Sequence, residues 1–446
     1  MEKRLVILGG GESGVGAALL GKKEGYNILL MDEGSLKDGY RKELQQAGID
    51  FKENGIDAEN LLHADEVVKS PGIPEKNEWI RKLRSKGIPI ISEIELAFRH
   101  KEKSKIIAIT GSNGKSTTTA LIFHICKTAG LNCALVGNIG YSFAKQIAED
   151  PKELYVAEIS SFQLDDIKEF RPDVALLLNI TEDHLDRYEY KFENYVASKF
   201  RITMNQTSED YFIYNQDDEV ITSYLRQKPI KSFQLPISMK QKVAKGGYIQ
   251  NEEMHIQVKE EQTQMSIYDF ALKGKHNQYN TMAASVAGAT MDIRKDKIRE
   301  AVETFENLEH RMEMVATVRG VEFINDSKAT NVNSTWFALE SMTRPTVLVL
   351  GGIDKGNDYS LLEDLVKEKV KAIVCMGVDN SKIHAAFDGK VSDVIDTASA
   401  EQAVEVAYRL ATVGDVVLLS PACASFDLFK NYEDRGKQFK EAVKSL

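Results

Sequence analysis

The stretch Lys105-Ile-Ile-Ala-Ile-Thr-Gly-Ser-Asn-Gly-Lys-Ser-Thr-Thr-Thr119 joins an apolar run to two glycines, a lysine and four successive hydroxyl residues. A buried strand that leads through such a loop into a helix forms a phosphate cradle, because backbone N–H groups and the lysine approach the phosphate oxygens. The spacing is GxxGKS, since the commoner GxxxxGK[ST] would need glycine where Ile109 stands. An ordinary glycine-bearing turn before a helix is the plainer alternative. We predict an ATP-binding loop with contacts from Gly111, Ser112, Asn113, Gly114, Lys115, Ser116, Thr117 and Thr118.

Short runs of Val, Ile and Leu alternate with amphipathic stretches of helix length along almost the whole chain. This alternation is typical of parallel sheets covered by helices, so we predict an α/β protein. We place a Rossmann-like domain at 1–100, a central P-loop domain with a parallel sheet at 101–310 and a Rossmann-like C-terminal domain at 311–446. The polar segment 210–270 predicts an antiparallel excursion in the central domain. The predicted strands are Leu5–Leu8, Ile28–Met31, Glu66–Val68, Ile88–Ile91, Tyr155–Ile159, Val174–Ile180, Thr346–Leu350, Ala372–Met376 and Val416–Leu419.

The composition limits the kinds of partner. A formal charge of −10 argues against broad binding to nucleic acid or anionic membranes, which needs a basic surface. No apolar stretch approaches the length of a membrane span, and the N-terminus lacks the apolar segment of a signal peptide. The four cysteines have no CxxC spacing, which indicates a reducing compartment and no zinc site. We expect a cytoplasmic monomer with small-molecule substrates.

The N-terminal segment carries the glycine pattern of a nucleotide-binding unit. Gly9, Gly11 and Gly14 follow the first predicted strand, and Asp32 closes the next one. This layout fits dinucleotide sites and other nucleotide sites alike, and the glycines could also serve only the close packing of helix on strand. On this segment alone, an NAD-dependent dehydrogenase stays an open alternative.

Two predicted strands end in groups suited to a metal. Glu158 ends one apolar run, and the next run ends at Asn179 and leads into a polar segment that contains His184. Since the carboxyl ends of parallel strands meet at one edge of a sheet, these groups should lie beside the phosphate loop. Mg²⁺ takes oxygen ligands from carboxylates and phosphates, so we predict a magnesium site with Glu158 as a ligand. For His184, a capping or solvated histidine is the plainer interpretation.

A string of motifs resembles the Mur ligases, the ATP-dependent amide-forming enzymes of peptidoglycan precursor synthesis. The resemblance spans nearly the whole chain. Its ATP motifs are shared with folylpolyglutamate synthases, whereas its C-terminal strings resemble the D-glutamate-adding members. The motifs are Gly9–Gly14, Ser70–Ile73, Thr110–Thr119, Gly137–Gly140, Glu158–Leu164, Thr181–Tyr188, His276–Asn280, His310–Glu313, Asn325–Asn331, Gly351–Lys355, Ser420–Asp427, Phe429–Asn431 and Arg435–Gly436.

The resemblance implies roles in the first two domains. The first domain would bind the uridine diphosphate part of the substrate instead of NAD, although Glu12 lies beside the expected diphosphate. Lys199 would be carbamylated, which turns a cation into an anionic oxygen ligand, whereas on composition it is one more helix lysine. The implied uridine-substrate contacts are Ser13, Asp32, Gly72 and Asn138, and the implied ligands of two Mg²⁺ ions are Ser116, Glu158, His184 and Lys199.

The resemblance also implies the reaction and the C-terminal contacts. ATP would phosphorylate the alanyl carboxylate of UDP-N-acetylmuramoyl-L-alanine, and the amine of D-glutamate would attack the acyl phosphate, with Lys115, His184 and Lys199 as catalytic residues. The third domain would close on the second, because the nucleotide and amino-acid contacts come from both. The implied nucleotide contacts are Asn277, Arg311 and Asp326, and the implied D-glutamate contacts are His184, Lys328, Thr330, Lys355, Ser425 and Phe426.

Three alternatives are weighed against this hypothesis. A dehydrogenase would leave Thr110–Thr119 and Glu158 without a role. A nonenzymatic nucleotide-binding module or inactive paralogue would be expected to lack one of the four central groups, and all four are present, namely Lys115, Glu158, His184 and Lys199. A Mur ligase that accepts a different amino acid is the nearest competitor.

Overall fold

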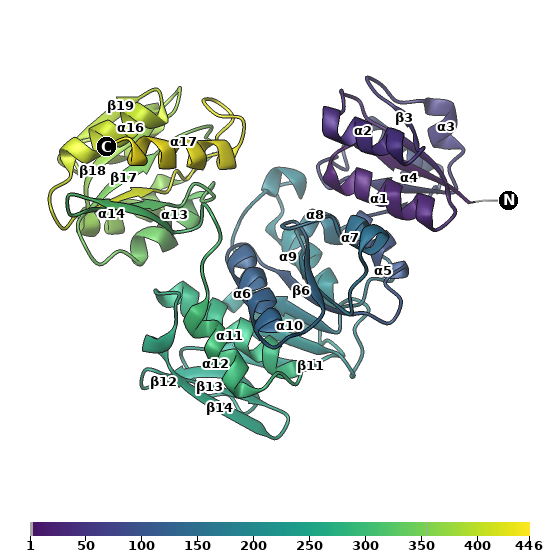
Figure 1. Cartoon of the computed structure of the whole chain (residues 1–446), viewed down its shortest axis with the longest axis horizontal. Coiled ribbons are helices and arrows are strands. Elements are labelled where there is room, and N and C mark those ends of the chain that lie inside the picture. The colour runs from purple at the N-terminus through teal and green to yellow at the C-terminus, as the bar shows by residue number, and fades with distance from the viewer. Residues whose placement is uncertain (1–2, 355) are drawn as a thin grey trace. The chain divides into compact units, whose positions relative to one another are not determined.

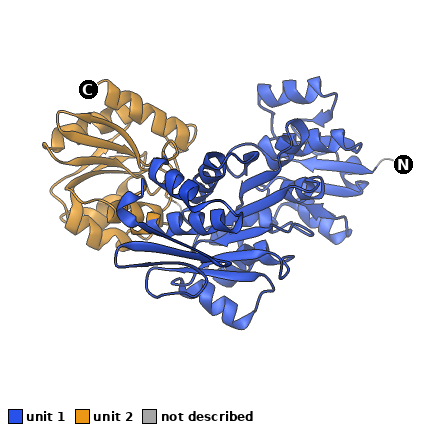
Figure 2. Ribbon diagram, turned by 60° about the horizontal axis from the view of Figure 1, so that its bottom comes forward, with its two compact units in different colours: residues 1–271, 278–305 blue, residues 272–277, 306–446 orange. Residues whose placement is uncertain are grey.

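The chain forms three sheets, each covered by helices, in a computed structural model that describes residues 3–354 and 356–446 (Figure 1). It divides into two compact units, residues 1–271 with 278–305 and residues 272–277 with 306–446 (Figure 2). The first unit contains two of the sheets and the second unit contains the third. The predicted α/β class is confirmed. Lys355 lies outside the described residues, and within them no helix has both the length and the apolar character of a membrane span.

The first sheet is wholly parallel, in the order β3-β2-β1-β4-β5. Alternate residues of β1 enter different cores: Leu5 packs with the residues of α1 and α5, whereas Val6 packs with those of α3 and α4. Both faces are buried, which explains the apolar runs in the sequence. The elements are β1 Arg4–Leu8, α1 Glu12–Lys23, β2 Asn27–Met31, α2 Asp38–Gln46, β3 Asp50–Lys52, α3 Ala58–Leu62, β4 Glu66–Lys69, α4 Glu78–Ser85, β5 Ile90–Ile91 and α5 Glu93–Arg99.

The second sheet has the order β14-β13-β12-β11-β10-β9-β6-β8-β7, and its strands from β12 to β7 are parallel neighbours. The carboxyl ends of β6, β8 and β9 therefore meet at one edge. The elements are β6 Lys105–Thr110, α6 Lys115–Thr128, β7 Cys133–Gly137, α7 Phe143–Glu149, β8 Leu154–Glu158, α8 Ser161–Leu164, β9 Val174–Leu177, η1 Leu185–Arg187, α9 Phe192–Phe200, η2 Arg201–Thr203, β10 Tyr211–Asn215, α10 Glu219–Gln227, β11 Phe233–Ser238, β12 Gly246–Gln250, β13 Glu253–Val258, β14 Glu261–Ser266, η3 Ile267–Asp269, α11 Lys275–Thr290 and α12 Lys295–Thr304.

The antiparallel excursion predicted over 210–270 is right only in part. The strands β12, β13 and β14 pair antiparallel, but β10 and β11 run parallel to β9 and to each other, and β12 is parallel to β11. Polar side chains interrupt β10 and β11, so these strands lack the continuous apolar run that marks a buried parallel strand.

The third sheet has the order β15-β16-β20-β17-β18-β19, and only β15 and β16 pair antiparallel. Along β18, Ile373 and Cys375 pack in a core with α13, α14 and α15, whereas Ala372 and Val374 pack with α16 and α17. The elements are β15 Glu313–Val318, β16 Val321–Asn325, α13 Val332–Glu340, β17 Thr346–Leu350, η4 Tyr359–Leu362, α14 Glu363–Lys369, β18 Val370–Met376, α15 Ser381–Phe387, β19 Val394–Thr397, α16 Ala400–Leu410, β20 Val416–Leu419 and α17 Tyr432–Lys444.

Buried charges join the first two sheets within the first unit. The ammonium group of Lys69 lies 2.9 Å from Asp166 Oδ2, and Arg84 Nη2 lies 2.6 Å from Asp166 Oδ1. Both Lys69 and Asp166 are almost inaccessible to solvent. Glu95 of α5 is fully buried and accepts backbone N–H groups of residues 168–170. The contact between these two sheets thus depends on the carboxylates of Asp166 and Glu95, both of which are shielded from water.

We expect Asp166→Asn to lower the free energy of unfolding by about 3 kcal/mol, because it leaves Lys69 buried with one counter-ion fewer. Urea unfolding followed by circular dichroism measures the change. Asp150→Asn is the matched control, since Asp150 pairs with Lys152 but is 64% exposed, and its loss should cost less than about 1 kcal/mol. Equal losses for the two variants would contradict the role given to the buried pair.

Candidate active site

The loop between β6 and α6 is held from the end of β9. Asn179 Oδ1 accepts the Asn113 N–H at 2.8 Å, and Asn179 Nδ2 donates to the Asn113 carbonyl at 3.0 Å. Gly114 has a φ of +82°, and a Cβ added there would lie 2.5 Å from Asn280 Oδ1, so the position requires glycine. Because α6 begins at Lys115, directly after Gly114, the unpaired N–H groups of its first turn lie at this loop.

Two lysines share one backbone carbonyl of this loop. Lys115 Nζ donates to the Gly111 carbonyl at 2.8 Å, and Lys199 Nζ, from α9, donates to the same carbonyl at 2.8 Å. Lys199 is 2% exposed. Its pKa lies well below the ordinary value, first because of burial and then because of repulsion from Lys115, although the nearby carboxylates of Asp183, Asp165 and Glu158 oppose the shift. The pair favours an anion, or a neutral Lys199, at this position.

Glu158 ends β8 at the same edge and is fixed by one side chain. Its Oε1 accepts from Asn138 Nδ2 at 2.7 Å, and its backbone carbonyl accepts the Asn138 N–H at 2.8 Å. Among the described residues, Oε2 is buried without a hydrogen-bond donor. A buried carboxylate oxygen without a partner is costly, and a hard divalent cation would satisfy it. The donor set therefore fits Mg²⁺.

The segment after β9 lies against the same loop. Ser112 Oγ donates to the Thr181 carbonyl at 3.0 Å and lies 3.1 Å from the Tyr195 hydroxyl. The His184 ring packs edge-on against Phe162 at 5.1 Å, and its Nε2 lies 3.6 Å from Asp183 Oδ2. Asp183 in turn acts electrostatically on Lys199. The structure thus brings the segment of His184 to the lysine pair, as parallel strand order predicts.

The other predicted loop contacts are buried at the start of α6, and they are Ser116, Thr117 and Thr118. The Thr118 hydroxyl has no hydrogen-bond partner in the described part of the chain.

The uridine contacts predicted in the first domain lie on separate elements. Asp32 Oδ2 accepts the Gly10 N–H at 2.6 Å, and Oδ1 accepts the Gly34 N–H at 2.7 Å, so this carboxylate holds two backbone turns. Ser13 lies in the first turn of α1, and Gly72 lies in the loop after β4.

An arginine that the sequence analysis missed connects the Gly72 loop to the His184 segment. Arg187 lies 4.3 Å from the centre of the Phe162 ring, and its guanidinium donates to the carbonyls of Pro71 at 3.0 Å and Gly72 at 3.4 Å. Arg187, within the motif Thr181–Tyr188, thus contacts Phe162 of the central domain and the Pro71–Gly72 loop of the first domain. No spacing rule marks Arg187, because its acceptors are backbone carbonyls more than 100 residues away.

The second unit contains the predicted C-terminal nucleotide contacts. Asp326 accepts from the Ser420 hydroxyl at 3.0 Å and from the Met312 N–H at 3.2 Å. Burial raises the pKa of Asp326 to about 6, against the opposing effect of Arg311. Arg311 Nε is itself buried without a hydrogen-bond partner in the described part of the unit. Asn277 Nδ2 donates to the Lys273 carbonyl at 2.8 Å.

The described D-glutamate contacts predicted in this unit lie in two segments, Asn325–Asn331 and Ser420–Asp427. Lys328 Nζ lies 5.5 Å from the Tyr432 ring centre, and Thr330 directly precedes Asn331, the N-cap of α13. Ser425 is buried, whereas Phe426 is exposed.

A buried arginine that the sequence analysis left without a role joins these two strings. Arg435 Nη2 donates to the Ser327 carbonyl at 2.8 Å, and Nη1 donates to the Cys423 carbonyl at 3.2 Å. Burial lowers its pKa to about 10. Arg435 thus fixes the relative position of both strings.

Known proteins resemble this chain along its full length. Residues 3–92 match the Mur ligase MurD-like N-terminal domain, residues 109–288 the Mur ligase middle domain, and residues 310–423 the Mur ligase glutamate ligase domain. A UDP-N-acetylmuramoylalanine–D-glutamate ligase of Christiangramia forsetii is 53% identical over 446 residues, with 100% of both chains covered. The protein of that name from Bacteroides fragilis is 51% identical over 445 residues, again with 100% of both chains covered.

Solved structures show the same fold at low identity. UDP-N-acetylmuramate-alanine ligase MurC from Thermotoga maritima has a TM-score of 0.63 and 18% identity, with 99% of both chains covered. A pseudomurein peptide ligase type C from Methanothermus fervidus has a TM-score of 0.62 and 19% identity, with 100% of both chains covered. The three matched domains and the full-length relatives confirm the predicted three-domain organisation, and this chain belongs to the Mur ligase family.

Proposed function

We propose that this chain is an ATP-dependent ligase that joins D-glutamate to UDP-N-acetylmuramoyl-L-alanine in peptidoglycan precursor synthesis. The observation that carries the chemistry is the lysine pair on the Gly111 carbonyl, beside the buried, half-satisfied carboxylate of Glu158. The choice of substrate rests on the relatives of about 50% identity, which bear the name of that activity over their full length. A dehydrogenase would leave the lysine pair and Glu158 without a role.

The reaction needs activation because a carboxylate does not acylate an amine when oxide is the leaving group. Transfer of the γ-phosphoryl group of ATP to the alanyl carboxylate makes an acyl phosphate and ADP. The amine of D-glutamate attacks its carbonyl, loses a proton and expels phosphate, which leaves the amide. Lys115 and the first-turn N–H groups of α6 would neutralise the charge that the phosphates bring to the loop.

The metal ligands proposed here are the side chains of Ser116, Glu158, His184 and a carbamylated Lys199. When bound, Mg²⁺ would neutralise phosphate charge and align the transferred group. The Oε2 atom of Glu158, which is buried without a hydrogen-bond donor among the described residues, supports one Mg²⁺ site. The lowered pKa of Lys199 supports the second, because only a neutral amine adds CO₂.

The remaining assignments are proposals that rest on the family resemblance alone. Cytoplasmic location, a monomeric state, closure of the third domain and domain bounds at 100 and 310 belong with them. The uridine contacts are Ser13, Asp32, Gly72 and Asn138, the other nucleotide contacts are Asn277, Arg311 and Asp326, and the D-glutamate contacts are His184, Lys328, Thr330, Lys355, Ser425 and Phe426.

The function is tested by phosphate release from ATP with Mg²⁺ and UDP-N-acetylmuramoyl-L-alanine. We expect turnover with D-glutamate and little with L-glutamate, L-lysine or meso-diaminopimelate. Turnover with a different amino acid would replace the substrate assignment but keep the ligase. ATP binding without turnover for any amino acid would refute the proposed reaction.

Replacing the half-satisfied carboxylate should remove catalysis without unfolding the sheet. We expect Glu158→Gln to lower kcat about 100-fold or more, since the amide keeps the shape but not the charge for a cation. Asn138→Ala should weaken the apparent Mg²⁺ affinity about 10- to 100-fold, because it frees the carboxylate that Asn138 orients.

Steady-state rates across a Mg²⁺ titration measure both effects. The control is Asn132→Ala, an exposed asparagine just before β7, which should leave the rate and the Mg²⁺ dependence unchanged. If Glu158→Gln keeps wild-type kcat at saturating Mg²⁺, the carboxylate is not a metal ligand in turnover.

Carbamylation of Lys199 predicts a dependence on dissolved CO₂. Because the pKa of Lys199 lies below the ordinary lysine value of about 10.4, the folded protein carries a neutral amine at pH values where an exposed lysine is still charged. Carbamate formation should therefore increase as the pH rises toward about 10.4. We expect enzyme depleted of CO₂ to lose activity and to regain it with bicarbonate.

Nuclear magnetic resonance with isotopically labelled bicarbonate should show a carbamate signal. Lys199→Arg should lack the signal and the activity, because a guanidinium stays protonated. The control Lys191→Arg replaces an exposed lysine at the start of α9 and should keep both. A carbamate signal that survives Lys199→Arg would place the modification elsewhere.

A further inference from the structure

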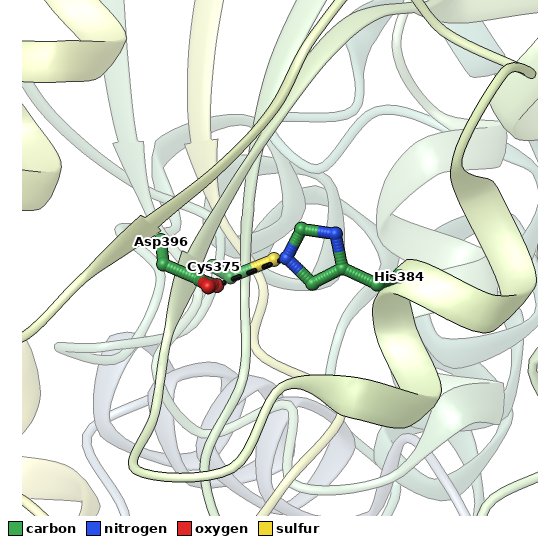
Figure 3. Close-up of side chains that lie close together, drawn as sticks. All are labelled: Cys375, His384 and Asp396. Carbon is green, nitrogen blue, oxygen red and sulfur yellow. Dashed lines mark hydrogen bonds and ion pairs between the residues drawn. The ribbon is translucent and has the colours of Figure 1, made fainter.

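Three side chains with metal-binding chemistry meet at the outer strands of the third sheet, in the second unit (Figure 3). Cys375 of β18 and Asp396 of β19 are direct register partners on neighbouring parallel strands. His384 comes from α15, the helix that connects these two strands. One ligand atom from each of the three residues lies within 4.8 Å of the others. The β18-α15-β19 crossover thus brings together sulfur, nitrogen and oxygen donors.

The imidazole of His384 is oriented on both sides. Its Nδ1 lies 3.0 Å from Asp388 Oδ1, and its Nε2 lies 3.2 Å from Asp396 Oδ1 (Figure 3 shows the second contact). Asp388 on Nδ1 holds the ring as a carboxylate holds a metal-binding histidine, whereas Nε2 would exchange its contact with Asp396 for the metal. Asn380 Nδ2 donates to Asp396 Oδ1 at 2.9 Å and thereby orients that carboxylate as well.

The thiol of Cys375 is the second, independent observation. Cys375 is fully buried, and its sulfur lies within 4.8 Å of a ring nitrogen of His384 and a carboxylate oxygen of Asp396. In Figure 3 the side chains of Cys375, His384 and Asp396 point toward one another. Cys375 belongs to the core that it forms with α13, α14 and α15, and at the edge of that core its sulfur meets the polar groups of His384 and Asp396.

We propose that Cys375, His384 and Asp396 bind a zinc ion, with solvent at the fourth position and Asp388 and Asn380 orienting the ligands. A thiolate, an imidazole and a carboxylate together suit Zn²⁺ rather than Mg²⁺, which takes oxygen ligands. Ligand atoms around a tetrahedral Zn²⁺ lie about 3.5 Å apart, so the side chains close in by about 1 Å on binding. The absence of CxxC spacing hid this site, because its donors come from two strands and a helix.

Binding has a definite proton balance. The Cys375 thiol loses its proton to solvent as the zinc–sulfur bond forms, and the imidazole of His384 releases its Nε2 proton to solvent while it keeps its Nδ1 proton for Asp388. Burial, reinforced by the carboxylates of Asp396 and Asp388, raises the pKa of the Cys375 thiol to about 12, so the thiol holds its proton until a metal displaces it. Without metal, the imidazole of His384 forms ion pairs with Asp388 and Asp396.

The test uses Co²⁺ in place of spectroscopically silent Zn²⁺ on the full chain, after treatment with a chelator and in the presence of excess Mg²⁺. We expect a near-ultraviolet thiolate-to-cobalt charge-transfer band that saturates at one equivalent and disappears when Zn²⁺ is added. The Mg²⁺ ligands proposed near Gly111 include no thiol, so metal bound there cannot produce this band. The outcome of the cobalt test is therefore independent of the proposed ligase activity.

Matched variants identify the ligands. Cys375→Ser and His384→Gln should abolish the band, and Asp388→Asn should weaken zinc affinity about 10- to 100-fold, measured by competition with a chelator. The controls are Cys133→Ser, another buried strand cysteine, and His63→Gln, another exposed-face histidine, and both should keep the band. His384→Gln, on a partly exposed helix, keeps the test valid if Cys375→Ser fails to fold.

The zinc site would be overturned if the wild-type chain gave no charge-transfer band. It would also be overturned if the band persisted in the His384→Gln variant. Zinc should also raise the unfolding temperature of the wild-type chain and not that of His384→Gln, because a ligand stabilises only a folded state that binds it. An equal shift in both proteins would likewise overturn it, since the stabilising metal would then be bound elsewhere.

Discussion

Two ammonium groups on one carbonyl oxygen form the constraint on which the central domain depends. Lys115 and Lys199 come from different helices, and both donate to Gly111 at 2.8 Å. Each lysine is well placed for an anion, but together they oppose each other in a site that water hardly reaches. The conflict is relieved by a phosphate between them or by loss of the charge on Lys199. The fold holds the loop in place through the two hydrogen bonds of Asn179 to Asn113 and the turn at Gly114, which has a φ of +82°.

The order of the parallel strands explains why the charge repulsion between Lys115 and Lys199 arises at the phosphate loop. Since β8 and β9 both flank β6, their carboxyl ends deliver Glu158 and the His184 segment to the phosphate loop. Sequence alone predicts this convergence, because it needs only apolar strands and the rule that parallel strands end at one edge. It also predicts most of the buried parallel strands inside each sheet, because their two buried faces give a continuous apolar run, but it leaves the edge strands β3, β7, β15 and β19 unmarked.

Contacts between a side chain and a distant backbone could not be predicted in the same way. Arg187 and Arg435 each bind carbonyl oxygens, which every residue possesses and which leave no mark in the sequence. Asn138 was assigned to the substrate, and its bond to Glu158 becomes evident only from the pairing of Gly137 with Glu158 between β7 and β8. The parallel course of β10 and β11 was missed because polar residues interrupt both strands.

The carboxylate of Asp32 has a consequence for the ligand-binding edge of the first domain. In dinucleotide enzymes an acidic residue at the end of the second strand holds the ribose hydroxyls of the cofactor. Here both oxygens of Asp32 already accept backbone N–H groups, from Gly10 and Gly34. The carboxylate therefore braces the turn after β1 against the loop after β2 before any ligand arrives. A ligand that reaches this glycine-rich edge meets a negative charge whose position is already set, so its recognition costs no further ordering of that side chain.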